Sequence, residues 1–303
     1  MIKFEGILTV TVTPFDDSDR VDFDAYGRLI EFVLSQGVHC IIPCGTTGEY
    51  YALALDERRE IMRFVKDAVG GRARLLAGAN ATTTAHVIGL GRYAKELGYD
   101  GVMLAAPFYS QPTTAELIRH FRDVDAAIDM PIMLYNFPAR TGVDMSPEFL
   151  DGVRDIKNIR GIKESSGSLQ RMHVLATRFA DQLDLVCGMD DQAVEAFLWG
   201  ARSWVAGASN FLPAEHVALY RACVRDRDFE AGLTLMRRLM PMLELLEQGG
   251  KYMQYCKYGC ELAGVPVGDV RAPLRPLDDA ERQRFRQLYE AFAAVSAASM
   301  AAQ

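Results

Sequence analysis

The stretch PIMLYNFPARTGVDMSPEFLDGVRDIKNIRGIKESSG, residues 131–167, contains one complete strand–helix–strand unit. Its two short apolar runs, at residues 131–135 and 159–163, are nearly continuous, as expected for strands buried on both faces of a parallel sheet. Between them, Ser146-Pro147-Glu148 places a capping residue before a first-turn proline and an acid, which predicts the start of a helix. Strands joined by helices in this way are typical of an α/β protein.

The same alternation extends along the chain in both directions. Helical patterns with one apolar side occupy residues 22–35, 56–69 and 84–97. Eight strands alternating with helices predict a closed (β/α)8 barrel, the TIM-barrel fold. The alternative, an open doubly wound sheet, requires a glycine-rich first turn, whereas the first strand here leads into Thr13-Pro14-Phe15-Asp16. The six further predicted strands are residues 7–13, 40–44, 74–78, 101–105, 183–187 and 203–206.

More helix follows the eighth strand than a barrel needs. Helical patterns run over residues 213–226, 228–248, 251–262 and 278–301, and no linker or low-complexity stretch separates them from the barrel. We therefore expect a catalytic barrel over residues 1–225 and a C-terminal helical extension over residues 226–303 that packs on it.

Composition and charge exclude several classes of protein. Half of the 303 residues are hydrophobic, which is enough to bury a large core, and the formal net charge is −7. No Lys/Arg run forms a basic stripe, so nucleic acid is not an expected partner. No apolar stretch approaches the roughly 20 residues of a membrane helix, so a membrane is not expected either. The N-terminal MIKFEGILTVTVTPFDD is interpreted as a first strand and not as a signal peptide.

The six cysteines are scattered and lie mostly in apolar contexts, which predicts buried, reduced thiols in a cytoplasmic protein. Cys256 and Cys260 are four residues apart, but no nearby histidine or second cysteine pair completes a metal site, so we expect no metal. The other four are Cys40, Cys44, Cys187 and Cys223.

Lys163 is the residue that carries most of the functional argument. Active sites of (β/α)8 barrels collect where the strands end, and Lys163 alone among the lysines follows a buried strand. Burial there favours the neutral amine, which can attack a ketone and form an imine. The protonated imine withdraws electrons, so the neighbouring carbon loses a proton and becomes a nucleophilic enamine. The structural alternative is that Lys163 pairs with Glu164.

Other strand ends carry groups that suit the chemistry of a keto acid. The turn Gly45-Thr46-Thr47-Gly48 offers two hydroxyls and backbone N–H groups for a carboxylate or phosphate. Tyr135 ends the preceding strand of the quoted unit and could carry protons. Arg140 offers a guanidinium fork for a second carboxylate. Each of these has an ordinary structural explanation by itself, but together at one face of a barrel they form a consistent set.

Three motifs in this order resemble those of the dihydrodipicolinate synthase / N-acetylneuraminate lyase family, the pyruvate-dependent class I aldolases. They are GTTGE at residues 45–49, YNFPARTG at residues 135–142 and GIKESSG at residues 161–167. The resemblance covers most of the chain, from Thr11-Val12-Thr13-Pro14-Phe15 to Arg271-Ala272-Pro273-Leu274. It implies a Schiff-base lyase that condenses pyruvate with an aldehyde resembling aspartate semialdehyde, or that cleaves the aldol in reverse.

The resemblance also implies roles for the strand-end residues. Lys163 would form the imine with pyruvate, and Tyr135 would shuttle protons beside it. Thr46 and Thr47 would hold the pyruvate carboxylate, with Gly48 in the same cradle, and Thr47 would belong to a Thr–Tyr–Tyr proton relay.

Three further residues match family positions. Tyr109 would reach into a neighbouring subunit's site and complete the relay, Arg140 would bind the second substrate's carboxylate, and the backbone carbonyl of Val205 would face the keto acid. The family implies a homotetramer, built as a dimer of dimers, that needs no metal or organic cofactor because the covalent lysine–pyruvate imine does the chemistry.

The chain departs from the synthase branch in two places. The usual Asn-Pro-x-Pro-Val-Lys segment of the tail reads Tyr252-Met253-Gln254-Tyr255-Cys256-Lys257. The bulky pair Tyr50-Tyr51 follows GTTGE where small residues are usual, and with Leu55 and Arg58 it does not resemble a lysine-feedback pocket. We therefore expect no inhibition by lysine.

The acceptor substrate stays open. The run Val205-Ala206-Gly207-Ala208-Ser209-Asn210-Phe211-Leu212-Pro213 is similar to sugar-acid members of the family such as 2-keto-3-deoxygluconate aldolase. A 2-keto-3-deoxy sugar-acid aldolase or dehydratase is therefore an alternative to the synthase. A barrel that binds keto acids without turnover is a third hypothesis.

Overall fold

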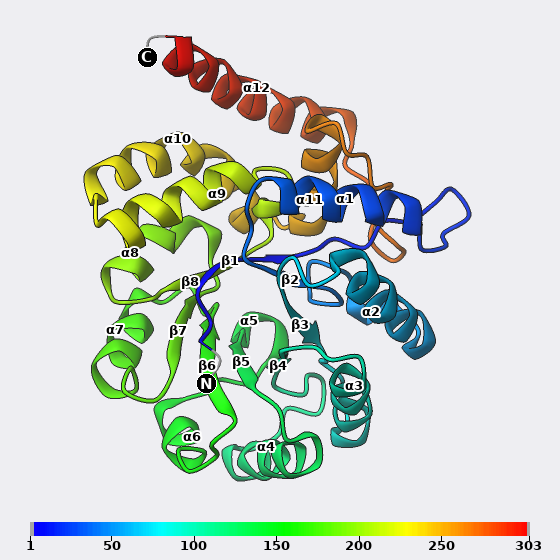
Figure 1. The fold of residues 1–303 in the computed structure, drawn as a ribbon, viewed down its shortest axis with the longest axis vertical. Helices are drawn as coiled ribbons and strands as arrows, with labels where there is room; N and C mark the ends of the chain where they lie inside the picture. The colour runs from blue at the N-terminus through cyan, green and yellow to red at the C-terminus, as the bar shows by residue number, and fades with distance from the viewer. Residues whose placement is uncertain (1–2, 302–303) are drawn as a thin grey trace.

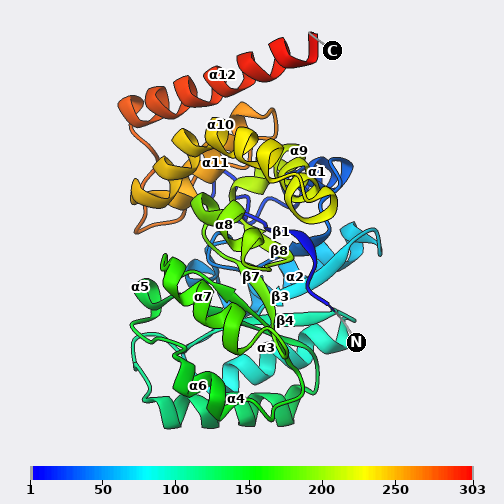
Figure 2. The ribbon, with the colours of Figure 1, turned by 90° about the vertical axis from the view of Figure 1, so that its left-hand side faces the viewer.

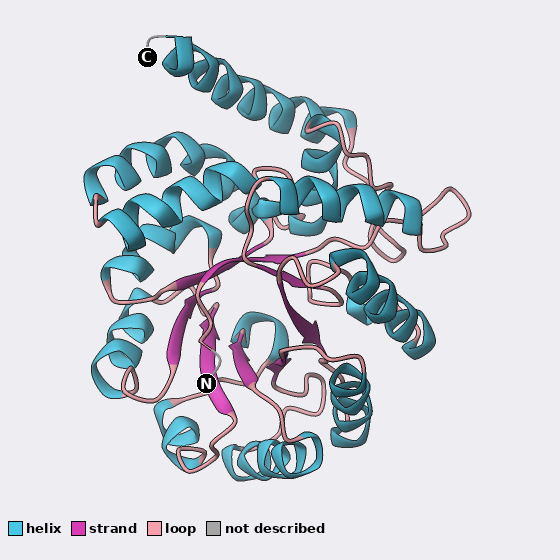
Figure 3. Cartoon of the chain, in the orientation of Figure 1, coloured by secondary structure: helices cyan, strands magenta, loops and turns pink. Residues whose placement is uncertain are grey.

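Eight parallel strands close into a barrel in sequence order in the computed structural model, which describes residues 3–301. Figures 1 and 3 show the strands at the centre with helices around them, as the alternating pattern predicts. The barrel closes between the first and last strands, where Leu8 is in register with Val205. The strands are β1 (Gly6–Val10), β2 (Cys40–Ile42), β3 (Arg74–Gly78), β4 (Gly101–Ala105), β5 (Ile132–Asn136), β6 (Ile159–Glu164), β7 (Asp184–Cys187) and β8 (Ser203–Ala206).

Six of the helices described here begin at a residue whose side chain accepts from a first-turn N–H group. The Asp22 side chain accepts a hydrogen bond from the Ala25 N–H at the start of α1, and Ser146 accepts one from Phe149 at the start of α6, as its sequence predicts. The twelve α-helices among residues 3–301 are α1 (Phe23–Ser35), α2 (Leu55–Val69), α3 (Thr84–Glu96), α4 (Thr114–Ile128), α5 (Pro138–Thr141), α6 (Pro147–Gly152), α7 (Leu169–Arg178), α8 (Ala193–Leu198), α9 (Pro213–Tyr220), α10 (Phe229–Gln248), α11 (Tyr252–Leu262) and α12 (Asp279–Ala301).

Two strands end earlier than the apolar runs suggest. The run predicted for residues 7–13 leaves the sheet after Val10, because the Val12 N–H donates to the side chain of Asn210 and not to a strand. The second strand stops at Ile42, and Cys44 adopts a φ of 57°, which turns the chain into the loop that follows. The residues after Val10 and after Ile42 therefore belong to loops at the carboxyl ends of the strands.

The apolar core has two layers. One cluster fills the space between the barrel and its helices, and a second fills the barrel interior. The interior cluster includes Phe4, Leu8, Met133, Tyr135 and Val205, so Tyr135 stands at the upper limit of a closely packed interior. All six cysteines are buried and free. No helix within residues 3–301 is both long enough and apolar enough to cross a bilayer.

The C-terminal helices fold back onto the barrel. A π-helical segment, η4 (Arg221–Asp226), extends α9, and α10 then packs on α9 and on the short helix η2 (Asp190–Gln192). Figure 2 shows α12 lying across α10 and α11 on the side away from the strands. The loop between α10 and α11 and the start of α11 therefore lie beside the ends of β7 and β8.

A buried ion pair joins this tail to the loop after β2. The Lys257 ammonium of α11 lies 2.8 Å from the Glu49 carboxylate, and both side chains are almost fully removed from solvent. Lys257 also donates to the Asp269 carbonyl at 2.6 Å, while the other Glu49 oxygen accepts from the Arg271 N–H at 3.0 Å. Burial lowers the pKa of Lys257, which the charge of Glu49 partly counteracts. Paired in this way, the two charges compensate for their desolvation.

We predict that Lys257→Met destabilises the protein by about 3–5 kcal/mol, because it leaves Glu49 buried without its counter-charge. The matched control is Lys251→Met, which removes a partly exposed pair with Glu281 and should cost at most about 1 kcal/mol. Guanidinium denaturation measures both free energies of unfolding. Equal losses in the two variants would contradict the importance given to the buried pair, and Glu49→Gln should recover part of the loss in Lys257→Met.

Candidate active site

A pocket of about 600 Å³, counted out to its open mouth, lies at the carboxyl ends of the strands. Its lining comes from Val10 at the end of β1, Thr46 and Thr47 after β2, Tyr135 of β5 and Lys163 of β6. Gly188 after β7 and Val205 in β8 complete the barrel side. Six strands therefore contribute to one site, at the end of the barrel where the fold places its chemistry.

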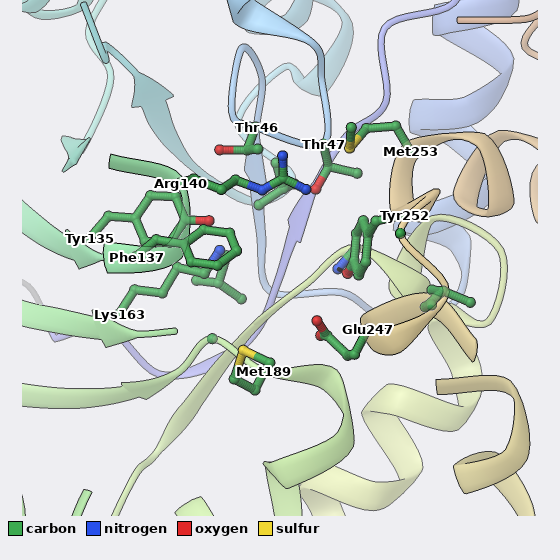
Figure 4. A pocket seen from close by; sticks show the side chains of 16 residues that line it. Thr46, Thr47, Tyr135, Phe137, Arg140, Lys163, Met189, Glu247, Tyr252 and Met253 are labelled. Atoms are coloured by element: carbon green, nitrogen blue, oxygen red, sulfur yellow. Dashed lines mark hydrogen bonds between the residues drawn. The ribbon is translucent and has the colours of Figure 1, made fainter. Parts of the chain in front are cut away.

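Lys163 and Tyr135 come from neighbouring strands at the same level. They are register partners in the β5–β6 pair, which places both side chains on the inner face of the barrel. The Lys163 amine lies 3.9 Å from the centre of the Tyr135 ring, and only 7% of Lys163 is exposed. Figure 4 shows both side chains extending into the pocket. The amine therefore lies over the face of the Tyr135 ring, and both side chains line the same pocket.

Glu164 does not neutralise the amine. Successive residues of a strand point to opposite faces, so Glu164 faces away from Lys163. Its carboxylate accepts hydrogen bonds from the Asn136 side chain at 3.0 Å and from the Ser166 N–H at 2.7 Å. Burial raises the pKa of Glu164, while these hydrogen bonds act in the opposite direction. The structural explanation of Lys163, a pair with Glu164, is therefore wrong, and no ion pair among residues 3–301 involves Lys163.

The loop after β2 forms the cradle expected from GTTGE only in part. Thr46 and Thr47 line the pocket, and Figure 4 shows them beside Arg140 and across from Tyr252. Gly48 lies outside the lining. Its carbonyl accepts from the Thr13 hydroxyl at 2.7 Å, and a Cβ at this position would come within 2.8 Å of the Thr11 carbonyl. Glycine is thus needed here for close packing of the loop on the segment that follows β1.

Arg140 stands between the main pocket and an adjoining cavity. It belongs to α5, a single turn that follows β5, and its guanidinium lies 5.4 Å from the centre of the Phe137 ring. The adjoining cavity is lined by Tyr50, Tyr51 and Phe108, and it shares Thr46, Tyr135, Phe137 and Arg140 with the main pocket. Arg140 is therefore positioned to bind a carboxylate at the edge of the site.

Tyr109 lies outside the pocket of its own chain. It follows Phe108 in the loop after β4, has a φ of 68°, and is 94% exposed. An aromatic side chain held outward by a left-handed backbone is strained, so the surrounding loop must hold it there.

The far wall of the pocket comes from the tail and was not predicted. It comprises Leu246, Glu247, Gly250, Tyr252 and Met253, with Met189 from the loop after β7 beside it. Tyr252 donates from its hydroxyl to Asp190 at 2.5 Å and accepts from the Gly207 N–H at 3.1 Å. A Cβ on Gly207 would collide with the Tyr252 ring, so glycine is required for this contact.

The far wall left little trace in the sequence. Gly249-Gly250 marks the turn between α10 and α11, but only the packing of α10 on η2 shows that this turn faces the pocket. Tyr252 was noticed as a departure from the family pattern, and not as a lining residue.

The comparisons with known proteins agree with this geometry. The profile of the Dihydrodipicolinate synthetase family matches residues 3–292. The 4-hydroxy-tetrahydrodipicolinate synthase of Caldicellulosiruptor saccharolyticus is 34% identical over 92% of this chain and 94% of its own. That of Pelobacter propionicus is 35% identical over 92% of this chain and 95% of its own.

Solved structures show the same likeness. Dihydrodipicolinate synthase from Aquifex aeolicus superposes with a TM-score of 0.91 at 28% identity, covering 96% of this chain and 98% of its own. YagE, a prophage protein of the dihydrodipicolinic acid synthase family from E. coli K12 solved in complex with pyruvate, gives a TM-score of 0.90 at 29% identity, covering 96% and 99%. The profile and the relatives together cover nearly the whole chain. This chain is a (β/α)8-barrel member of the dihydrodipicolinate synthetase family.

Proposed function

We propose that the protein is a Schiff-base-forming lyase or synthase that joins pyruvate to an aldehyde, or cleaves the resulting aldol. The observation that carries the proposal is the buried, unpaired Lys163 amine lying 3.9 Å from the ring centre of Tyr135 at the barrel mouth. The name of the family and of its relatives supports a lyase acting on small molecules.

The residues of the site suit each step. The Lys163 amine attacks C2 of pyruvate and water leaves, which forms a protonated imine. A proton then leaves the methyl carbon, and the electron pair moves into an enamine, with Tyr135 passing protons to and from the site. The enamine carbon attacks the aldehyde, a C–C bond forms, and water releases the product from Lys163. Because the imine itself withdraws electrons, this sequence needs neither metal nor organic cofactor.

The pyruvate carboxylate would lie on Thr46 and Thr47, close to Val205, while Arg140 would receive a carboxylate of the acceptor. Tyr109 would complete the relay in the neighbouring subunit of a cytoplasmic homotetramer. The 94% exposure of Tyr109 supports this role, because the side chain is free to contact another subunit.

We predict that borohydride added with pyruvate attaches a reduced pyruvyl group to Lys163, because only a neutral, accessible amine forms the imine that borohydride reduces. Intact-protein and peptide mass spectrometry measure the adduct. Lys163→Ala should show no adduct. An adduct on another lysine, or none in the unaltered protein, would sink the proposed mechanism.

We predict that Tyr135→Phe slows exchange of the pyruvate methyl protons into heavy water about 10²–10³-fold, because the ring remains but the proton carrier is lost. Imine trapping at Lys163 should persist in this variant. Tyr93→Phe, on α3 and away from the pocket, is the matched control and should exchange normally. A protein that binds keto acids without turnover would show no exchange even when unaltered.

We predict that lysine does not inhibit the enzyme. Where a lysine pocket would lie, the Arg58 guanidinium donates to the Asn80 and Gly78 carbonyls, both at 2.9 Å, and lies 5.2 Å from the centre of the Tyr50 ring. Arg58 thus occupies these two carbonyls, so they are not available to the ammonium groups of an incoming lysine. Steady-state rates with and without lysine test this, and a lysine-dependent fall in rate would contradict it.

A further inference from the structure

Glu247 is an acid at the end of α10 that faces the proposed reacting groups across the pocket. Figure 4 shows its carboxyl directed into the space between Met189 and Tyr252. One of its oxygens accepts from the Asp190 N–H at 2.8 Å, which fixes the side chain against η2. The hydrogen bond from Asp190 is the one that the described residues 3–301 give to this carboxyl, and it leaves the second oxygen unused. The carboxyl is thus held in place by one oxygen and has the other available to a ligand.

The other side chains of this wall cannot form a hydrogen bond with a ligand in the pocket. The Tyr252 hydroxyl is committed to Asp190 and Gly207, so Tyr252 presents only its ring. Leu246, Met189 and Met253 are apolar. Glu247 is therefore the one side chain of the tail-derived wall that can exchange a hydrogen bond with a molecule in the pocket.

The charge state of Glu247 indicates the kind of partner. Burial, and after it the charge of Asp190, raises the pKa of Glu247 to about 8, while Lys163 acts in the opposite direction. Burial also raises the pKa of Asp191 in the same short helix. The raised pKa favours the protonated form of the Glu247 carboxyl, which both donates and accepts hydrogen bonds. A neutral group of this kind suits a hydroxyl better than it suits an ammonium.

The direction in which a substrate extends leads to the same wall. Lys163 lines the main pocket and not the adjoining cavity behind Arg140. A keto acid with its carbonyl carbon on Lys163 and its carboxylate on Thr46 and Thr47 is attached within the main pocket, which has space for its remaining carbons. The opposite wall of that space is the one that carries Glu247.

We propose that Glu247 is a specificity-determining residue that hydrogen-bonds a hydroxyl on the acceptor-derived part of the substrate, so that the enzyme prefers hydroxylated 2-keto acids. This inference rests on the proposed function, because it takes Lys163 as the point of attachment. It favours a polyhydroxy aldehyde over a simple aliphatic one as the acceptor.

The test compares two six-carbon keto acids that differ in their hydroxyls, 2-keto-3-deoxygluconate and 2-oxohexanoate. Each competes with pyruvate for Lys163, so the concentration that halves the initial rate of pyruvate methyl exchange measures its binding. In Glu247→Leu, the half-inhibitory concentration of 2-keto-3-deoxygluconate should rise about five- to tenfold relative to that of 2-oxohexanoate. This is the effect expected from the loss of one hydrogen bond. Glu247→Gln keeps a donor and an acceptor and should stay within about twofold of the unaltered protein.

The matched control is Glu244→Leu, which changes an exposed acid one turn earlier on α10, outside the pocket. If Glu247→Leu does not fold, Glu247→Asp replaces it. The aspartate side chain is one methylene shorter, which withdraws the carboxyl from the pocket and should shift the ratio of the two half-inhibitory concentrations in the same direction. If Glu247 had a purely structural role, its substitution would weaken the binding of both keto acids equally. An unchanged ratio in the leucine or aspartate variant, with exchange intact, overturns the proposal for Glu247 alone. Absence of exchange in the unaltered protein overturns the proposed function itself.

Discussion

The ion pair between Glu49 and Lys257 holds the two halves of the site together. Glu49 ends the GTTGE loop that carries Thr46 and Thr47, and Lys257 lies on the helix that begins with Tyr252 and Met253. Neither charge can leave its partner without exposing the other to an apolar interior, so the separation of the cradle and the far wall is fixed. Lys257 is also the residue at which the tail segment keeps the lysine of the family pattern, although the residues before it differ.

Strand alternation explains why Lys163 remains available. The amine faces the pocket, and the carboxylate of the next residue faces Asn136 and Ser166 behind the strand. An acid can therefore follow the lysine in sequence without quenching it, because the barrel wall separates the two side chains. The same wall gives Glu164 hydrogen bonds that compensate for its burial.

The barrel and the inner half of the site followed from the sequence, because the strands are short apolar runs and the motif residues come directly after them. Three strands, β3, β4 and β8, match their predicted ranges, and Lys163, Tyr135, Thr46, Thr47, Arg140 and Val205 all line one pocket. Gly48 does not, because its packing on the segment after β1 depends on a contact that no local pattern encodes. Glu247 and Tyr252 were missed for a related reason, since the path of a helix after its last barrel contact is a tertiary property.

The far wall has a consequence for how the enzyme comes into being. Chains emerge from the ribosome N-terminus first, so all eight strands are synthesised before the segment that contains Glu247, Tyr252 and Lys257. Before that segment is added, the chain contains Lys163 and Tyr135 but not the residues of the far wall. Enclosure of a substrate beside Lys163 would therefore depend on a segment that is synthesised after every strand of the barrel.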